Sequence, residues 1–237
     1  MTDPVSPRAF DEFADEYDRL LHDPLRDRFA AGSDYFIEQK CRVLLRHLQP
    51  GSGAAAPPRL LDAGCGQGTA IAFLRKAFRV VGSDVSLPML HDAVRRGPVT
   101  VQEPFALPFA ADTFDAAYAF CVYHHIGAVD HARHLRELAR VVAPGGRVFV
   151  FEHNPYNPVT RTIFNRAPID QGCRMIRPAE LRRLFRAVGL ADVSCGYLLF
   201  VPESLSRVFG RLEPALSWLP LGGQYFVAGR KAESASR

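Results

Sequence analysis

The chain has 237 residues, of which 48% are hydrophobic, and it carries a formal net charge of +4. This length suits one α/β domain with a terminal addition, and the hydrophobic content is ample for its core. The arginines are scattered among acidic residues, so the sequence lacks the basic stripe of a nucleic-acid-binding surface and no nucleic-acid partner is expected.

The cysteine pattern and the N-terminal residues bear on the cellular compartment. The five cysteines include no Cys-x-x-Cys pair, which argues against a zinc site or a disulfide framework and favours a reducing compartment. Residues 1–7 have neither the basic nor the apolar region of a signal peptide. No uncharged apolar run approaches the roughly 18 residues of a membrane-spanning helix. The sequence therefore predicts a cytoplasmic protein without a transmembrane segment.

Helices are expected over the first fifty residues. Apolar side chains recur there at helical spacing, and they are Phe10, Phe13, Tyr17, Leu20 and Leu21. A second helix is expected from Ser33 or Asp34 to Leu48, with Ser33 as its N-cap. Residues 49–58, rich in glycine, alanine and proline, read as a linker.

The stretch from Arg59 to Ala70 has the pattern of a ligand-binding turn between a strand and a helix. An apolar strand breaks there into glycines at positions 64, 66 and 68 before a helix. Such glycines permit a tight turn and let the backbone approach a ligand that a Cβ would exclude. Their Gly-x-Gly-x-Gly spacing differs from the Gly-x-Gly-x-x-Gly of dinucleotide-binding folds. A second strand, over 79–83, precedes Asp84, which is placed to hold a ribose diol.

These residues resemble the class I S-adenosylmethionine-dependent methyltransferases of type 11/12. The matching segments run from Leu61 to Thr69 and from Val80 to Ser86. The resemblance implies a Rossmann-like α/β fold: a seven-stranded sheet with helices on both faces, an antiparallel last strand and an N-terminal helical lid. It also implies S-adenosyl-L-methionine as the cofactor. A generic Rossmann-type domain that uses its glycines for another nucleotide, or for none, is the alternative.

Later segments match the same family in chain order. Residues 103–109 resemble its adenine-binding segment, although Glu103 replaces the usual aspartate and Pro104 has no N–H to donate. Gln102 is the alternative residue for those adenine contacts, and the sequence does not decide between the two. Tyr17 resembles a lid tyrosine that approaches the cofactor, although plain helix packing explains it equally well. The cofactor contacts that the resemblance implies are Asp62, Gly64, Cys65, Gly66, Gly68, Asp84, Val85, Met89, Glu103 and Tyr17.

Four residues are candidate catalytic bases. His124 and His125 follow the strand over 114–120, at the sheet edge where open parallel sheets bind ligands. His153 and Glu152 follow the strand over 147–151 at the same edge. A structural role for one of the paired histidines is the alternative.

Two further histidines lie outside this group. His131 and His134 are three residues apart on the helix expected over 130–142, as two metal ligands would be. Since no third ligand is near in sequence, they are read as part of a solvated helix face, and no metal is expected.

The segment after residue 151 is the least generic in the chain. Its two Asn-Pro steps predict an extended, turn-rich path at the mouth of the site. The polar residues there are predicted to bind the methyl acceptor, and solvated loop polarity is the alternative. They are Asn154, Tyr156, Asn157 and Arg161.

The C-terminal part completes the expected domain. A helix over 178–188 and strands over 192–200 and 224–230 are predicted, with an apolar insertion at about 202–223. The insertion is open to three interpretations: a cover for the acceptor pocket, a dimer face or a peripheral membrane contact. The domain division is thus a lid over 1–50, a cofactor-binding core over 59–230 and a disordered tail over 231–237.

The predicted function is a methyltransferase that moves a methyl group from the cofactor sulfonium to a small-molecule acceptor. A non-catalytic protein that binds the same cofactor, as a sensor or partner subunit, is the alternative from another class. The sequence does not distinguish O-, N- and C-methylation, nor a monomer from a homodimer.

Overall fold

A seven-stranded mixed sheet forms the centre of the molecule, in the strand order β3-β2-β1-β4-β5-β7-β6. The structure is a computed structural model, and it describes residues 7–48 and 56–233. The strands are β1 (Arg59–Ala63), β2 (Arg79–Asp84), β3 (Val99–Val101), β4 (Phe114–Phe120), β5 (Val142–His153), β6 (Ala191–Leu198) and β7 (Gln224–Arg230). Only β7 runs antiparallel to its two neighbours. The predicted fold class, including the antiparallel last strand, is confirmed.

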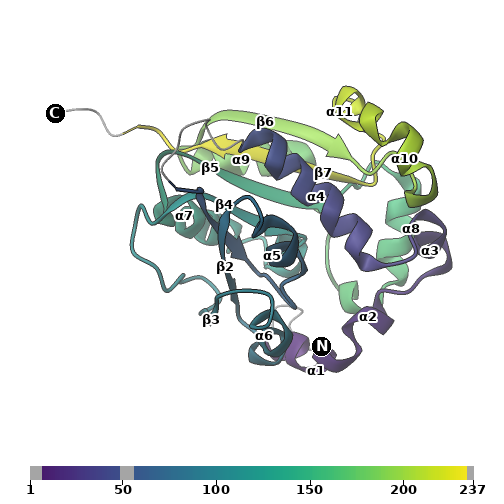
Figure 1. The fold of residues 1–237 in the computed structure, drawn as a ribbon, viewed down its shortest axis with the longest axis horizontal. Helices are drawn as coiled ribbons and strands as arrows, with labels where there is room; N and C mark the ends of the chain where they lie inside the picture. The colour runs from purple at the N-terminus through teal and green to yellow at the C-terminus, as the bar shows by residue number, and fades with distance from the viewer. Residues whose placement is uncertain (1–6, 49–55, 234–237) are drawn as a thin grey trace.

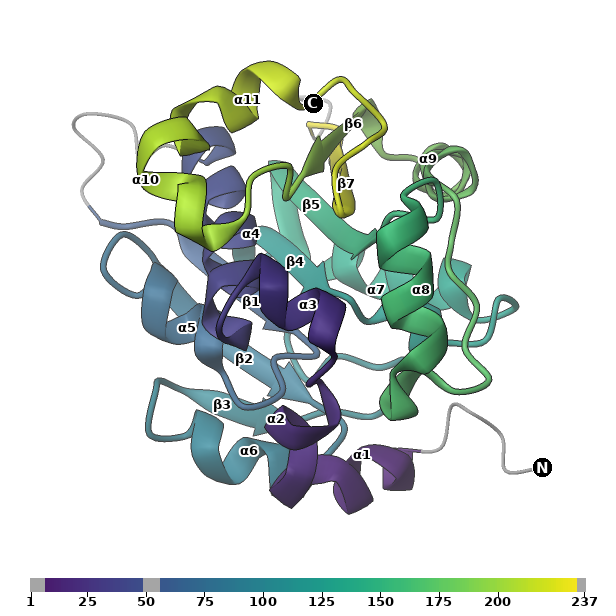
Figure 2. The same ribbon diagram turned by 90° about the vertical axis from the view of Figure 1, so that its right-hand side faces the viewer.

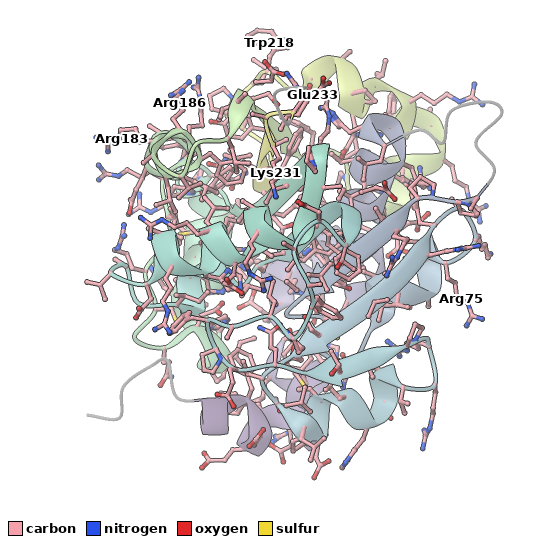
Figure 3. All side chains as sticks on the ribbon, turned by 90° about the vertical axis from the view of Figure 1, so that its left-hand side faces the viewer. Arg75, Arg183, Arg186, Trp218, Lys231 and Glu233 are labelled. Atoms are coloured by element: carbon pink, nitrogen blue, oxygen red, sulfur yellow. The ribbon has the colours of Figure 1, made fainter. Side chains whose placement is uncertain are left out.

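Helices cover both faces of this sheet (Figure 1). The described α-helices are α1 (Pro7–Phe13), α2 (Tyr17–Leu20), α3 (Pro24–Phe29), α4 (Ser33–His47), α5 (Thr69–Leu74), α6 (Leu87–Ala93), α7 (His131–Val141), α8 (Pro158–Arg166), α9 (Pro178–Ala187), α10 (Ser206–Phe209) and α11 (Glu213–Leu216). One half of the core lies under α4 and α5, and the other under α7 and α9. In α9 the apolar Leu181 and Phe185 are buried, whereas Arg183 and Arg186 project outward (Figure 3). That division is the expected result of apolar residues at helical spacing.

The N-terminal segment differs from the continuous helical face predicted for residues 10–21. It is divided into α1, a 3₁₀ turn at Ala14–Glu16, α2 and α3. The helix α3 restarts at Asp23, whose Oδ1 accepts the Leu25 N–H at 2.8 Å, with Pro24 in the first turn. The short pieces let the segment bend over the carboxyl ends of the strands (Figure 2).

Two other local predictions need correction. The N-cap of α4 is Gly32, because Ser33 is already helical and its Oγ accepts a hydrogen bond from Arg26 instead. The turn-rich path predicted after β5 is present only over residues 154–157, and the helix α8 begins at Pro158. Asn157 caps it by accepting the Val159 and Thr160 N–H groups at 2.9 and 3.0 Å. Proline is tolerated at the first helical position, so the second Asn-Pro step starts a helix instead of preventing one.

His131 and His134 are buried, which corrects the solvated helix face predicted for them. His131 Nε2 lies 2.9 Å from the carbonyl oxygens of both Tyr123 and Ile126. His134 packs its ring 5.2 Å from that of Tyr123, and burial lowers its pKa to about 4. The two histidines therefore hold the turn that carries His124 and His125.

The insertion between β6 and β7 forms short helices that pack beside the N-terminal helices (Figure 1). Buried Glu213 accepts the N–H groups of residues 199–201 at 2.9–3.3 Å. The Tyr35 hydroxyl on α4 donates to the Val201 carbonyl at 2.7 Å. Trp218 is 73% exposed and projects from the end of the molecule (Figure 3).

The described residues include no helix that is long and apolar enough to cross a membrane. Most of the predicted linker, residues 49–55, lies outside the described residues. The same holds for residues 1–6 of the predicted lid and for residues 234–237 of the predicted tail.

Candidate active site

Two adjoining cavities lie at the carboxyl ends of β1, β2, β4 and β5, the edge of an open α/β sheet where ligands bind. The larger has a volume of about 530 Å³ and the smaller about 130 Å³. Their shared walls are Tyr17, Gly64, Gly66, Phe120, Cys121 and His125. The helices α1 to α3 and α8 lie over this edge (Figure 2).

The glycine turn after β1 forms the floor between the two cavities. Gly64, Gly66 and Gly68 have φ values of 75°, 51° and 78°, a region that favours glycine. A Cβ on Gly66 would meet no atom closer than 3.9 Å and would therefore project into the cavity. A Cβ on Gly68 would lie 3.0 Å from Ala93, so that glycine serves the contact between α5 and α6.

Asp84 fixes this turn. One carboxylate oxygen accepts the Gly66 N–H at 2.7 Å and the other accepts the Ser86 N–H at 2.9 Å. Burial raises the pKa of Asp84, while these backbone N–H groups oppose the rise. The side chain lines the smaller cavity together with Val85 and Met89.

Two buried oxygens beside the turn have no hydrogen-bond partner among the described residues. Asp62 Oδ2 lies in the larger cavity, and burial raises the pKa of this carboxyl to about 7, with the neighbouring Tyr118 hydroxyl acting against the rise. Gln102 Oε1 lies in the smaller cavity. Glu103 is exposed and lines neither cavity. Unpaired buried oxygens are costly, and a ligand with an ammonium group at one end and an amino group at the other would satisfy both.

Polar side chains from three elements meet on one wall of the larger cavity. His124 Nδ1 lies 2.6 Å from Glu152 Oε2, and its Nε2 lies 3.2 Å from Asp170 Oδ1. His125 Nε2 lies 3.5 Å from the same Asp170 oxygen. Asp170 sits in the 3₁₀ turn Pro168–Asp170 that follows α8.

Burial and charge divide the two histidines into different states. Burial would lower the pKa of His124, but Glu152 and Asp170 outweigh it and raise that pKa well above its usual value. His125 has its pKa lowered to about 3 by burial and by His124. At neutral pH, His124 is therefore a buried imidazolium and His125 a neutral imidazole.

Cys121 is a residue that the sequence did not mark as part of a site. It follows β4 with a φ of 56°, a strained conformation for a residue other than glycine. Its Sγ lies 3.5 Å from both Lys40 Nζ and Gln224 Nε2. Burial acts to raise the pKa of this thiol, but Lys40 and His153 outweigh it and lower the pKa to about 7.

The remaining sequence-predicted residues divide into lining and supporting groups. His153, Asn157 and Cys65 line the larger cavity. Glu152 is fully buried and Asn154 donates to the Pro220 and Gly222 carbonyls, so both support their neighbours. Tyr156 and Arg161 are exposed and line neither cavity.

Three residues of this site were not among the predicted ones: Lys40, Cys121 and Asp170. Asp170 follows Phe164 and Ala167 in an irregular segment, and nothing in its spacing links it to the strand ends. Lys40 was the one of the three that the sequence could have marked as a site residue, because it lies among apolar residues of a helix. Lysine is seldom buried without a function or a partner, and Lys40 is buried in the structure.

Comparison with known proteins identifies the core of this chain. A family model described as a methyltransferase domain matches residues 61–150. A demethylmenaquinone methyltransferase of Corynebacterium kroppenstedtii is 42% identical over 109 residues, which cover 45% of this chain and 47% of that protein. The chain contains a class I S-adenosylmethionine-dependent methyltransferase domain.

Other relatives of this methyltransferase domain have different acceptors. A tRNA (carboxymethyluridine(34)-5-O)-methyltransferase of Arabidopsis thaliana is 29% identical over 147 residues, or 61% of this chain and 34% of that protein. The chain thus spans about half or less of the length of these two relatives. A solved S-adenosylmethionine-dependent methyltransferase of Thermotoga maritima is 20% identical with a TM-score of 0.68, covering 94% of this chain and 98% of its own, which shows the shared fold.

S-adenosyl-L-methionine is the cofactor of this domain, and the cavities at the glycine turn fit it. The open space above Gly66 and the unpaired oxygens of Asp62 and Gln102 are features that a bound molecule with amino groups at both ends would complete. The larger cavity continues beyond this turn toward α3 and α8.

Proposed function

We propose that this protein transfers the methyl group of S-adenosyl-L-methionine to a small, largely apolar acceptor in the larger cavity. The observation that carries the proposal is the cavity itself. Its volume of about 530 Å³ is within the roughly 300–1,000 Å³ of small-molecule sites. Most of its walls away from the glycine turn are apolar, and they include Leu25, Phe29, Ile37, Phe164, Ile169 and Phe200.

The distribution of polarity in this cavity suggests the chemical class of the acceptor. The histidines and Asp170 form one polar wall, and the walls toward α3 and α8 are largely aliphatic and aromatic. An aromatic ring that carries an ionisable oxygen and an apolar substituent would match both parts. The relative that acts on demethylmenaquinone supports this class, since a reduced quinone has such a ring. We therefore infer a hydroxylated aromatic acceptor of the quinol type.

The roles of the candidate catalytic residues follow from their surroundings. Positioning of the two reactants alone supplies roughly 7–11 kcal/mol of a methyl-transfer barrier. Glu152 is fully buried against His124, so we assign it the positioning of that ring. Both nitrogens of His124 face carboxylates, which leaves His153 and His125 as the groups able to accept a proton from the acceptor. His153 is the stronger base candidate, because burial lowers the pKa of His125.

The cofactor contacts remain proposals of the same kind. Asp62 would accept the cofactor ammonium, Asp84 its ribose hydroxyls and Gln102 the adenine amino group. The protein backbone of the glycine turn would pass close to the cofactor at Gly64, Cys65 and Gly66. The side chains of Val85 and Met89 would lie beside the adenine. Tyr17 lines both cavities and would cover the junction between the two ligands.

An RNA acceptor is the competing function, since a tRNA methyltransferase is among the relatives. An RNA acceptor would need a basic surface that neutralises several phosphates and a base flipped into the site. The apolar walls toward α3 and α8 favour the smaller acceptor.

The proposal is tested by incubating the full chain with methyl-labelled S-adenosylmethionine and two acceptors in parallel. One is a short-chain demethylated menaquinol kept reduced, and the other is bulk tRNA. Label that appears in the extracted quinol and not in the tRNA is the expected result. An Asp84→Ala variant should lose that signal, while His22→Ala, at an exposed histidine outside both cavities, should keep it.

The opposite outcomes are equally clear. Label in tRNA alone would overturn the small-molecule assignment. Calorimetric binding of S-adenosylhomocysteine without transfer to either acceptor would favour a non-catalytic cofactor-binding protein.

A further inference from the structure

The group formed by His124, His125 and Asp170 is unusual for its arrangement of donor atoms. One nitrogen from each histidine and one oxygen from Asp170 lie within 4.8 Å of one another. The Asp170 oxygen is 3.2 Å from His124 Nε2 and 3.5 Å from His125 Nε2. Zinc ligands bound at about 2.0–2.2 Å in a tetrahedron are separated by about 3.3–3.6 Å, so both distances are close to an edge of that tetrahedron.

A second observation concerns the Asp170 side chain. The residue is only 7% exposed, and its Oδ1 makes no hydrogen bond of acceptable geometry with any described residue. The same oxygen points to the two histidine nitrogens and lies on the wall of the larger cavity. A metal ion placed between this buried oxygen and the two histidine nitrogens would bind all three atoms at once.

The residues behind the three donors are arranged as outer partners of a metal site are. Glu152 Oε2 lies 2.6 Å from His124 Nδ1, which directs the opposite nitrogen of that ring toward Asp170. Cys173 Sγ lies 3.3 Å from His125 Nδ1 and does the same for the second ring. A carboxylate on the far nitrogen of a histidine is the usual outer partner of a metal-bound imidazole.

Charge also favours a divalent ion at this point. Glu152 and Asp170 contribute two buried carboxylates, one beside each nitrogen of the His124 ring. A divalent ion held by His124, His125 and Asp170 would balance the charge of both.

We propose that His124, His125 and Asp170 form a mononuclear site for a divalent transition metal, with Zn²⁺ as the ion that fits best. Two nitrogens and one oxygen are a ligand set that zinc accepts, and three protein ligands leave the fourth position open to the cavity. That open position faces the space assigned to the acceptor. If the proposed methyl transfer is correct, the metal ion would also bind an ionised oxygen of the acceptor. Only this role in acceptor binding, and not the metal site itself, rests on the proposed function.

The site is tested with the untagged full chain, stripped with a chelator and then titrated with Zn²⁺ by calorimetry. Co²⁺ serves as a spectroscopic probe, because its visible bands are much stronger in tetrahedral than in octahedral sites. One equivalent of either ion and a tetrahedral Co²⁺ spectrum are expected. Asp170→Asn should weaken Zn²⁺ binding at least tenfold, and Glu152→Gln by about 10- to 100-fold.

Controls separate this site from adventitious binding. His91→Gln, at an exposed histidine on α6, should bind Zn²⁺ as the unaltered chain does. Circular dichroism checks that each variant is folded. Asp170→Asn is used in place of His124→Ala because it keeps the side-chain volume, whereas His124→Ala would leave two buried carboxylates unpaired.

Three results would overturn the proposal: no binding by the folded unaltered chain, full affinity in Asp170→Asn, or binding that is lost only in Cys121→Ser. The last would place the ion at the thiol and His153 instead. None of these measurements requires the acceptor, so failure of the metal site and failure of the methyl transfer are distinguishable.

Discussion

At the scale of single residues, two aspartates at the ends of neighbouring strands have different tasks. Both carboxylate oxygens of Asp84 accept hydrogen bonds from backbone N–H groups in the turns that follow β1 and β2. Asp62 keeps one buried oxygen without a partner. Asp84 therefore fixes the glycine turn beside the proposed cofactor site, whereas Asp62 has an oxygen left for the cofactor ammonium that we propose it binds.

Asp84→Ala should weaken cofactor binding by at least about tenfold. The substitution removes charge-assisted hydrogen bonds worth roughly 1.5–3 kcal/mol each and also frees the Gly66 turn. Calorimetry with S-adenosylhomocysteine measures the effect, with Asp92→Ala, at an exposed aspartate on α6, as the matched control. An unchanged dissociation constant in a folded Asp84→Ala variant would place the ribose elsewhere.

Asp62 should make the free energy of unfolding depend on pH in a predictable direction. Burial raises its pKa to about 7 in the folded chain, against about 4 when unfolded. Between these values the unfolded chain has lost the proton that the folded chain keeps. The contribution of Asp62 therefore falls as pH rises through this window and is constant above it.

Urea unfolding of the cofactor-free chain at pH 5 and pH 8 measures this dependence. The unaltered chain should lose about 2–3 kcal/mol more over that interval than Asp62→Asn, by 1.36 kcal/mol per pKa unit. Equal losses in the two proteins would mean that Asp62 is ionised throughout.

Among the helices and loops, two segments outside the family core shape the larger cavity, where we propose that the acceptor binds. The helix α8 brings Ile163 and Phe164 to its wall, and the turn after α8 brings Asp170. The insertion before β7 anchors residues 199–201 through Glu213 and supplies Leu221 to the same wall. In each segment one side chain accepts several backbone N–H groups, Asn157 at the start of α8 and Glu213 in the insertion.

Asn157→Ala should cost about 1 kcal/mol of stability through the lost N-cap of α8, within the usual range of 0.5–2 kcal/mol. Asn157→Ser retains an accepting oxygen at the N-cap without setting a second oxygen against the Leu221 carbonyl, and it should restore most of that loss. Urea denaturation of the three proteins gives the comparison. If the alanine variant lost methyl transfer but no stability, the side chain would act on the acceptor and not on the helix.

Glu213→Ala should be more destabilising than the loss of the cap. Its buried carboxylate accepts three backbone N–H groups, and removing it leaves those donors without their partner. We expect a loss of at least about 2 kcal/mol in the free energy of unfolding. Glu203→Ala, which removes one exposed bond to the Ala31 N–H, is the control and should cost under about 1 kcal/mol.

Across the molecule as a whole, the helices α1 to α3 lie over the carboxyl ends of the strands (Figure 2). Their direct ties to the site are few: Asp11 Oδ1 accepts from Ser86 Oγ at 2.6 Å, and the Phe10 ring lies 4.9 Å from that of His125. Tyr17 lines both cavities from the same segment. We propose that residues 7–29 act as a lid that the bound cofactor completes.

Hydrogen exchange with and without S-adenosylhomocysteine tests the lid. Amides in α1 to α3 should exchange at least several-fold more slowly with ligand, because the ligand fills the space beneath them. Amides of α9, on the other side of the sheet from α4 and α5, should change little. Equal slowing in both regions would indicate a general stabilisation and no lid.

The sequence by itself determined the cofactor half of this protein. Alternating glycines after an apolar strand leave few backbone paths, and Asp84 at the next strand end must lie beside them in a parallel sheet. The existence of the strands follows from short apolar runs with turn signals, which are local properties, whereas the fold class followed from the family resemblance. Helix α9 and strand β7 were placed within two residues for the same reason.

The acceptor half was decided by tertiary structure. Asp170 meets His124 only because α8 folds back over the end of β5, a path that the Asn-Pro steps suggested would be extended. The burial of His131 and His134 likewise depends on the turn they support, which no periodicity reveals. Local patterns record what each segment prefers, whereas contacts between segments 45 residues apart depend on how the chain closes on itself.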